Sequence, residues 1–492
     1  MDFKKIFFIF CIVFFNLLPG SARAESAYEC GGAVEEASWR LWDQHARSLL
    51  RNQFLDRRLL QMGDSYALYD IQVYFQNLEA MAERCGRSSR LIEFADDLMV
   101  AYDALEALNN GSNDRVWVCK GGSTCKGNGR LIGKEVPLVS AQGLGLMSAL
   151  AAALANSKDF GARSHPFVIK TASVSAQHLL RWGGIKARER WRNLIDAKPD
   201  DVKNANSELL FSDQELWQIA IYANLAKIYT ARPALEFNSD RHRNEQPNES
   251  IQVLLHLFKS RVSFKIVPNS RLGRVRTAEI DRGFWRMYGD SRYAGYEGSI
   301  KPIICDRGVS NGKAELVVDG KDVPIVPDIG WDFSHARRLV HVLTALQGSQ
   351  LAMQQIYGLR SSDFPDADLA QAFAAQLVVS IWNGDKDAPL FANYWSGANG
   401  WYRATYENGS KSCSSGYPPF GLTEAFATGG YAVWAKYYPA IDEIAHSIYI
   451  LTIGKNNASS AYIENYFSGM TSKVSSGSRM INQLMFWPSM VH

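Results

Sequence analysis

The sequence predicts a mainly α-helical protein. Segments with apolar residues at helical spacing recur from near residue 35 to near residue 470. Many of these segments form neighbouring pairs with short connections, and strand signals are few. No linker rich in proline, glycine or serine divides the chain, and no block of like charge does so. We therefore expect residues 25–492 to form a single domain.

The helices can be placed from apolar spacing and from their end signals. Apolar residues at helical spacing predict one helix over 68–84 and another over 88–108. Ser212–Glu215 reads as a capping box that opens a helix. A helix over 366–382 is stopped by an Asn-Gly pair. Further helices are predicted over 140–155, 167–181, 184–196, 249–260, 334–357, 420–437, 440–453 and 458–470.

Successive antiparallel helix pairs in one chain suit either a solenoid or a closed ring. No fixed repeat period is visible, which argues against a solenoid. We therefore expect an α/α toroid, an incomplete or closed ring of about six helical hairpins. Its loops would gather at one end and form a cleft long enough for a polymer. Lys313–Val326 predicts a small β-hairpin with an Asp-Gly turn, an excursion from the helical body.

The N-terminal residues have the parts of a secretory signal peptide. A basic start is followed by an apolar run from Ile6 to Leu18 and by the small-x-small pattern Ala22-Arg23-Ala24. The run is shorter than the roughly 20 residues that a membrane-spanning helix needs. We expect cleavage after Ala24 and a periplasmic or secreted protein without stable membrane insertion. An uncleaved membrane anchor is the alternative.

The charge of the chain argues against nucleic acid as a partner. The full chain has a net charge of +3, and removal of residues 1–24 takes away three cations and one anion, leaving +1. Nucleic-acid binding needs a dense basic face that neutralises phosphates. An acidic substrate met by a few local arginines remains compatible with this charge.

The cysteine count predicts disulfides. Cys11 lies in the predicted signal peptide, and the six remaining cysteines can pair in fifteen ways. Cys119 and Cys125 bracket a glycine-rich loop and are the favoured pair. Metal binding is the alternative there, but the spacing matches no common zinc pattern and no histidine lies nearby.

Three segments crowd polar and aromatic side chains together and are the candidate functional regions. They are 281–297, 331–338 and 393–407, and the third holds two tryptophans, two tyrosines, two asparagines and an arginine between positions 393 and 403. Aromatic rings stack on the apolar faces of sugars, while Asn, Arg and Asp side chains hydrogen-bond their hydroxyls. We therefore expect these rings to face a solvent-filled groove. The alternative is a loop folded back on the helical body, with the tryptophans as its packing.

The start of the helix at 334 carries a candidate proton acceptor. Asp332 or Ser334 can cap this helix, but capping does not explain His335 in the first turn. The helix dipole disfavours a cationic imidazole there, and a neutral histidine at a cleft mouth can accept a proton.

Two chemistries fit these residue types. A lyase acting on a uronic acid must neutralise a carboxylate, abstract the α-proton and return a proton to the leaving oxygen. Tyr402 or Tyr394, with His335, would exchange protons, and Arg403, Asn399 and Asn393 would hold the carboxylate. The candidate catalytic residues are His335, Tyr402, Tyr394, Arg403 and Asp332. The candidate substrate-binding residues are Asn393, Trp395, Asn399, Trp401, Tyr406, Arg292, Tyr293, Glu297 and Arg338.

Two alternatives remain open at the level of sequence. An inverting glycoside hydrolase would use Asp332 with Glu297 or Glu407, at a carboxyl separation of roughly 6.5–9.5 Å. A non-catalytic glycan-binding or exopolysaccharide assembly protein would need the aromatic loop without the ionisable groups. The chain has no GxGxxG, phosphate-binding loop, HExxH or GxSxG motif, so we expect neither a cofactor nor a metal.

The chain resembles the alginate-lyase type of α/α toroid. The resemblance lies in the paired helices after a signal peptide and in the Asn/Tyr/Trp/Arg-rich segment followed by the helix predicted over 420–437. Family members carry an Asn-Asn-His motif followed by aromatic residues, whereas Asn393-Tyr394-Trp395 lacks the adjacent histidine. The resemblance implies a toroid that cleaves a uronate-containing polysaccharide.

Overall fold

The computed structural model describes most of the chain, and it is mainly helical with small antiparallel sheets. The described residues are 27–108, 114–127, 129–199, 210–235, 247–270, 272–284, 328–403, 416–454, 460–471 and 475–492, with the backbone of three short strands between 296 and 316. The predicted signal peptide lies outside these residues.

α-Helices make up most of the residues that the structure describes. The α-helices up to the β4–β5 hairpin are α2 (Ala33–Leu41), α3 (Tyr66–Arg84), α4 (Ser88–Met99), α5 (Gly122–Gly127), α6 (Pro137–Ala155), α7 (Phe160–Ser164), α8 (Pro166–Trp182), α9 (Ile185–Ile195), α10 (Asp213–Ala231) and α11 (Pro247–Arg261). The later α-helices are α12 (Phe333–Ala336), α13 (Arg338–Tyr357), α14 (Leu369–Gln376), α15 (Ala425–Thr428), α16 (Pro439–Ile453), α17 (Ser460–Tyr466) and α18 (Ser476–Met490).

Tighter and wider helical turns occur beside these helices. The π-helical segments are η1 (Trp42–Ala46), η2 (Leu49–Gln61) and η11 (Leu377–Ile381), and 3-10 segments include η3 (Val100–Ala104) and η12 (Tyr431–Lys436).

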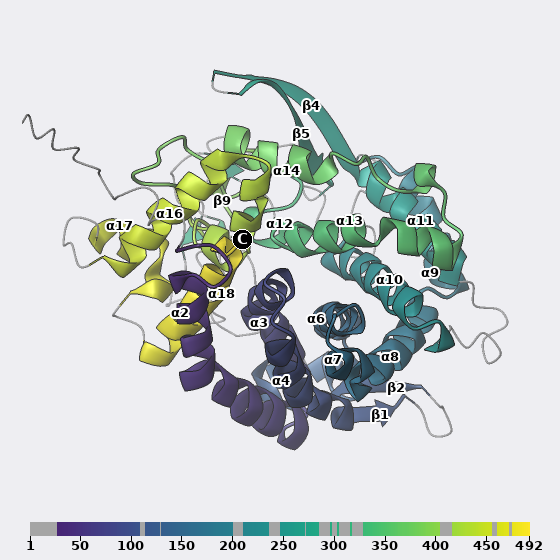
Figure 1. Ribbon diagram of the computed structural model, residues 1–492. Helices are drawn as coiled ribbons and strands as arrows, with labels where there is room; N and C mark the ends of the chain where they lie inside the picture. The colour runs from purple at the N-terminus through teal and green to yellow at the C-terminus, as the bar shows by residue number, and fades with distance from the viewer. Residues whose placement is uncertain are drawn as a thin grey trace, which may run out of the picture.

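The core is a succession of long helices in which α3, α6, α10 and α13 pack side by side in that order, and α18 packs against α3 (Figure 1). Helices α6 and α10 are buried on nearly all sides. Their close approach depends on Gly145, where a Cβ atom would lie 2.5 Å from the Trp217 ring. The glycine pair at 143 and 145 therefore serves helix packing.

Helix α6 is long and apolar enough to be compared with a membrane-spanning helix. It is the one helix among the described residues with the length and composition to span a bilayer, and 89% of that window is buried inside the protein. It contacts α3, α8 and α10. This is the environment of a core helix.

Several predicted helix boundaries are confirmed. The capping box at Ser212 is present, with the Glu215 side chain accepting from the Ser212 backbone N–H at 3.1 Å. Helix α13 ends at Gly358, which adopts the left-handed conformation that favours glycine (φ +66°).

Five predicted helices are divided. The helices predicted over 88–108, 366–382 and 458–470 are α4 followed by η3 and the strand Leu105–Ala107, α14 followed by η11, and α17 followed by the 3-10 segment η14 (Ser468–Met470). The helix predicted over 334–357 begins one residue earlier and consists of α12 and α13, which meet at Arg337. The helix predicted over 420–437 is instead α15 and the 3-10 segment η12, separated by Gly429-Gly430. Gly430 has φ +77°, a left-handed conformation that interrupts the helix, and a Cβ there would lie 2.4 Å from Asn77 Oδ1, so the position requires glycine.

Helix α18 was not predicted. Its apolar residues Ile481, Leu484 and Met485 are buried at helical spacing. Pro488 lies in its last turns and reads as a helix-breaking signal in the sequence.

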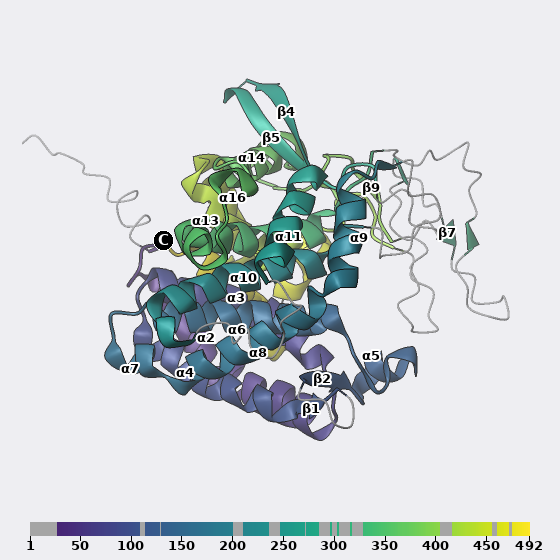
Figure 2. The ribbon, with the colours of Figure 1, turned by 90° about the vertical axis from the view of Figure 1, so that its right-hand side faces the viewer.

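The strands in the described part of the chain form four small antiparallel sheets. They are β1 (Leu105–Ala107), β2 (Arg115–Cys119), β3 (Lys134–Glu135), β4 (Val262–Asn269), β5 (Gly273–Ile280), β6 (Tyr296–Glu297), β7 (Ile303–Ile304), β8 (Glu315–Leu316) and β9 (Gly400–Trp401). The longest pair is the β4–β5 hairpin, which projects from the helical body beside α14 (Figures 1 and 2).

The β4–β5 hairpin was not predicted, whereas a hairpin was predicted over 313–326. The β4–β5 turn closes at Gly273 with φ +73°, and Asn269 Oδ1 accepts from Leu272 N at 3.0 Å. In the predicted segment the structure describes Glu315–Leu316, which pairs with Ile303–Ile304. The predicted Asp-Gly turn lies outside the described residues.

The predicted disulfide Cys119–Cys125 is present, and a second joins Cys30 to Cys85. Cys305 and Cys413 lie outside the described residues. Two disulfides are consistent with an oxidising compartment.

Candidate functional site

The three segments singled out in the sequence meet in the structure. Strand β6 pairs with β9, which places Tyr296 opposite Trp401. Asp332 and Tyr394 form a β-bridge, and Phe333 N donates to Asn393 O at 2.8 Å. Regions separated by about a hundred residues of sequence therefore share one site.

The Asp332 carboxylate organises the start of α12. Its Oδ1 accepts from Ser334 N at 2.9 Å, from Ser334 Oγ at 2.5 Å and from His335 N at 3.1 Å. Asp332 is thus the N-cap residue that the sequence offered as one of two possibilities.

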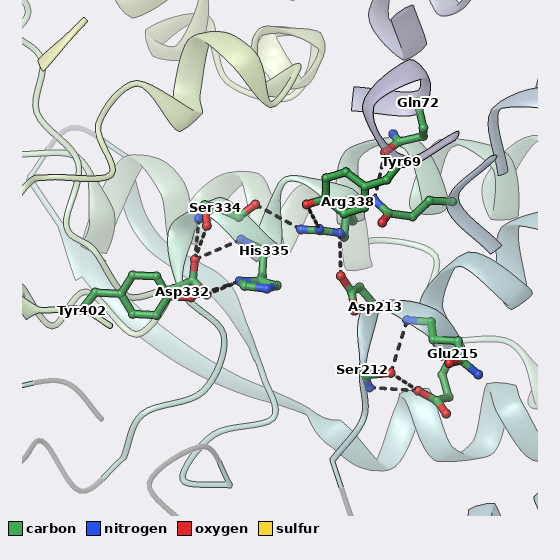
Figure 3. Close-up of polar contacts among 12 residues, drawn as sticks. Tyr69, Gln72, Ser212, Asp213, Glu215, Asp332, Ser334, His335, Arg338 and Tyr402 are labelled. Carbon is green, nitrogen blue, oxygen red and sulfur yellow. Dashed lines mark hydrogen bonds and ion pairs between the residues drawn. The ribbon is translucent and has the colours of Figure 1, made fainter. Parts of the chain in front are cut away.

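The other oxygen of Asp332 links His335 to Tyr402 (Figure 3). Oδ2 accepts from the Tyr402 hydroxyl at 2.8 Å and hydrogen-bonds His335 Nδ1. The Tyr402 hydroxyl and His335 Nδ1 are 3.3 Å apart. Asp332 and Tyr402 are buried, whereas the His335 side chain is 16% exposed. We call Asp332, His335 and Tyr402 the Asp–His–Tyr cluster.

The environment keeps Asp332 ionised. Burial raises the pKa of this carboxyl, but the charge and hydrogen bond of His335, the Arg403 guanidinium and the Ser334 hydroxyl outweigh burial. The net pKa lies below its usual range. The carboxylate hydrogen-bonds Nδ1 and fixes the orientation of the ring, so that Nε2 is the nitrogen that can exchange a proton with a bound molecule.

Backbone strain gathers around the same region. Among the described non-glycine residues, Asp281, Arg403 and Phe420 have positive φ, at 56°, 52° and 62°. Arg403 follows Tyr402 directly, and Phe420 N donates to Asn399 Oδ1 at 2.8 Å. Such conformations cost of order 1–3 kcal/mol each and concentrate at functional sites.

Arg338 was predicted to contact substrate, but it is buried and serves the protein interior. Its Nε lies 3.0 Å from Asp213 Oδ2, its Nη2 donates to the Tyr69 hydroxyl at 3.2 Å, and its Nη1 lies 3.4 Å from Ser334 O. Figure 3 shows this network running from the Asp–His–Tyr cluster to the capping box of α10.

The network contains two residues that the sequence did not single out for function. Asp213 was interpreted only as part of a capping box, and Tyr69 only as part of a helix. No local pattern joins them to Arg338, because the three lie on α10, α3 and α13.

The prediction that the aromatic rings near 400 face a solvent-filled groove is wrong for the rings that the structure describes. Tyr394 and Trp395 are 0% and 1% exposed, and Trp401 and Tyr402 are 9% and 1% exposed. Trp395 Nε1 donates to Ala278 O at 3.0 Å, and its ring packs against Phe333. The alternative of a loop folded back on the helical body describes these rings.

Asn393, Asn399 and Tyr394 are occupied by backbone contacts. Asn393 Nδ2 donates to Gly400 O at 2.8 Å and to Pro418 O at 2.7 Å. Asn399 Oδ1 accepts from Phe420 N, and the Tyr394 hydroxyl donates to Trp401 O at 2.9 Å. These side chains shape the loop, so the prediction that the two asparagines bind the substrate carboxylate finds no support in their geometry.

The remaining predicted residues are only partly described. Arg292, Tyr293 and Tyr406 lie outside the described residues, and Glu297 is described only through its backbone pairing with Gly400.

Among the described residues, one group of possible metal ligands comes together, and it lies at Cys30, Glu35 and Cys85. Its two cysteines form a disulfide, and Glu35 accepts from the Arg87 guanidinium at 2.7 and 2.9 Å. These groups are therefore occupied by a covalent bond and an ion pair.

No protein-family model matches the chain, and no match is found among curated proteins or solved structures. The functional interpretation therefore rests on the geometry of the site.

Proposed function

We propose that the protein is an exported enzyme that cleaves a uronate-containing polysaccharide by β-elimination. The observation that carries this proposal is the Asp332 carboxylate shared between His335 Nδ1 and the Tyr402 hydroxyl. A buried ionised carboxylate, an imidazole that reaches solvent and a phenol within hydrogen-bond distance are the parts of a proton-transfer site.

In the proposed reaction His335 Nε2 accepts the α-proton of the uronate. The electron pair of that C–H bond forms the new C=C bond as the bond to the leaving oxygen breaks. The imidazolium then returns its proton to the leaving oxygen. Asp332 stabilises the imidazolium, and Tyr402 helps to hold Asp332 in place.

Arg403 is the residue proposed to bind the substrate carboxylate. It is partly exposed, and its guanidinium lies close enough to lower the pKa of Asp332. Neutralising the carboxylate makes the α-proton more acidic, because negative charge accumulates on the carboxylate as the proton leaves. The positive φ of Arg403 strains its backbone, and such strain is common where a side chain is held in a functional position.

The hydrolase alternative depends on Asp332 as a catalytic carboxyl, which its environment disfavours. Five donors surround its two oxygens: the N–H and hydroxyl of Ser334, the N–H and Nδ1 of His335, and the Tyr402 hydroxyl. A general acid needs a raised pKa, whereas that of Asp332 is lowered.

We extend the proposal to the fold and to the location. The helices α18, α3, α6, α10 and α13 pack in succession, and α13 and α18 both contact η12, which supports an α/α toroid. Two disulfides support export to the periplasm or outside the cell.

Incubation with a panel of uronate polymers tests the reaction. β-Elimination gives an unsaturated product that absorbs ultraviolet light, and this absorbance is the expected result. New reducing ends without absorbance would identify a hydrolase. Binding without either would identify a non-catalytic glycan-binding protein. Arg403→Ala should remove at least about 99% of turnover, because a charge-assisted contact to the reacting group is lost.

A further inference from the structure

A cavity of about 490 Å³ lies between the C-terminal end of α3, the first turns of α13, the segment η12 and residues 489–492. None of its lining residues belongs to the proposed active site. Its volume falls within the range of small-molecule sites, which runs from about 300 to 1,000 Å³. The cavity is therefore large enough for an organic molecule.

Most of the cavity wall is apolar. Val340, Ala432 and Val491 are buried, and Ala80 and Ala435 are partly exposed beside them. A wall of this kind stabilises a ligand by removing its hydrocarbon surface from water. The wall therefore fits the apolar body of a ligand.

The charged side chains that line the cavity balance one another. Arg84 and Lys436 are positive, and Glu83 and Asp442 are negative. Arg84 already interacts electrostatically with Glu79 and Glu83. A charged ligand would lose its hydration here without meeting an excess of opposite charge. The cavity therefore favours a molecule without net charge.

His341 places a neutral imidazole in the cavity wall. Burial, followed by the positive charges of Arg84 and Arg337, lowers the pKa of His341 to about 3. The ring is partly exposed, and no hydrogen bond joins it to another residue in the part of the chain that the structure describes. The two hydroxyls in the wall, those of Thr344 and Ser489, donate to backbone carbonyls of the preceding turn at 2.7 Å.

The imidazole determines which polar group a ligand needs. A neutral imidazole has one N–H donor and one nitrogen acceptor. A hydroxyl group also donates and accepts, so it can pair with either nitrogen of His341.

We propose that this cavity binds an uncharged amphipathic molecule, with a hydroxyl group hydrogen-bonded to His341 and an apolar body against the apolar wall. The ligand class follows from the balanced charges, the apolar wall and the neutral imidazole. The inference does not depend on the proposed lyase reaction.

1-Octanol is the probe, and calorimetry on the full chain is the measurement. We expect binding with a Kd of about 0.1–1 mM, the range for a ligand of this size. Octanoate and octylamine have the same chain with one charge each and should bind at least about fivefold more weakly, because the lost hydration of the charge is not compensated. Ethanol, which lacks the apolar body, should not bind measurably.

Nitrogen NMR and a histidine variant locate the hydroxyl group. Titration with 1-octanol should shift the ring-nitrogen signals of His341 and leave those of His256 on α11 unchanged. His341→Phe keeps a ring but removes the donor and the acceptor, and it should weaken binding about fivefold, the effect of one lost hydrogen bond. His256→Phe is the matched control and should leave binding unchanged, because His256 does not line the cavity.

Cavity-filling variants locate the apolar body. Ala435→Phe fills the cavity from η12 and should abolish binding of 1-octanol. Ala80→Phe fills it from α3 and takes the place of the first variant if that variant does not fold.

Four results would overturn the proposal. They are no binding of 1-octanol, a charged analogue that binds as tightly as 1-octanol, binding that leaves the His341 signals unchanged, and binding that survives in a folded cavity-filling variant.

Discussion

Replacing Asp332 by asparagine tests the acid–base proposal with a change of one atom. Asparagine keeps one carbonyl oxygen, which can still accept from the two backbone N–H groups and the hydroxyl that cap α12. Its amide NH₂ takes the place of Oδ2, where His335 Nδ1 and the Tyr402 hydroxyl now donate. In the variant, His335 Nδ1–H and the Tyr402 hydroxyl would therefore face the amide NH₂, which is itself a hydrogen-bond donor.

The loss can be estimated from these two hydrogen bonds. Hydrogen bonds to a charged group contribute about 1.5–3 kcal/mol each, and neutral ones about 0.5–1.5 kcal/mol. If the ring proton moves to Nε2 and the phenol rotates, the two bonds re-form as neutral ones. We expect a loss of about 2–3 kcal/mol in the free energy of unfolding.

The effect on catalysis should be much larger, because the tautomer changes. With the proton on Nε2, His335 presents a donor where the proposed reaction needs an acceptor. The same change in serine-protease triads lowers kcat about 10⁴-fold. We expect a loss of similar size in the formation of unsaturated product.

Asp363→Asn is the matched control. Asp363 is also a buried carboxylate beside a histidine. It ends the 3-10 turn Ser361–Asp363, accepts from Arg360 N at 2.7 Å and lies 3.1 Å from His256 Nε2. It should lose stability but keep activity. Nitrogen NMR of the His335 ring gives a readout that needs no substrate: the proton should lie on Nδ1 in the native protein and on Nε2 in Asp332→Asn. An unchanged tautomer, or activity within about tenfold of native, would refute the reasoning.

Three further predictions concern stability. Trp395→Ala should lower the free energy of unfolding by about 3–5 kcal/mol in urea denaturation, because the ring is buried; a loss below about 1 kcal/mol would contradict its place in the core. Replacing both cysteines of Cys30–Cys85 by serine should lower the free energy of unfolding by about 4 kcal/mol, because that bond joins residues 55 positions apart. The same change at Cys119–Cys125, six positions apart, should cost about half as much. A larger loss for Cys119–Cys125 in thermal unfolding would contradict the loop-entropy explanation. Burial raises the pKa of Asp363, but the Arg360 N–H and other hydrogen bonds outweigh it and leave the pKa at about 2. Because the folded pKa lies below the unfolded value near 3.9, the stabilisation is complete above about pH 4 and is lost as pH falls toward 2. In Asp363→Asn the midpoint of urea denaturation should therefore depend less on pH between about pH 4 and pH 2.

Much of the fold could be predicted from local sequence signals. The spacing that predicts a helix over 68–84 corresponds to α3, and the capping box at Ser212 opens α10 as expected. The predicted helix boundaries were wrong where residues distant in the sequence determine where a helix ends. The helix is interrupted at Gly430, which has φ +77°, and a side chain there would collide with Asn77; nothing in the local sequence reveals that neighbour.

The candidate site was predicted as three segments, and all three meet through β6–β9 and the Asp332–Tyr394 bridge. The direction of the side chains was not predicted. A loop dense in tryptophan and tyrosine has the same composition whether its rings face a sugar or the core. Only packing distinguishes the two outcomes.

The sequence by itself indicated the mainly helical class, two possible caps for the helix at 334 and Cys119–Cys125 as the favoured disulfide, because each depends on residues close together in the chain. Tertiary structure alone decided that Tyr402 shares the carboxylate of Asp332 from 70 residues away and that Trp395 is buried. It also placed Arg338 against Asp213, two residues on different helices. Neighbouring residues determine local hydrogen bonds and helical periodicity, whereas burial and long-range pairing depend on how the helices pack.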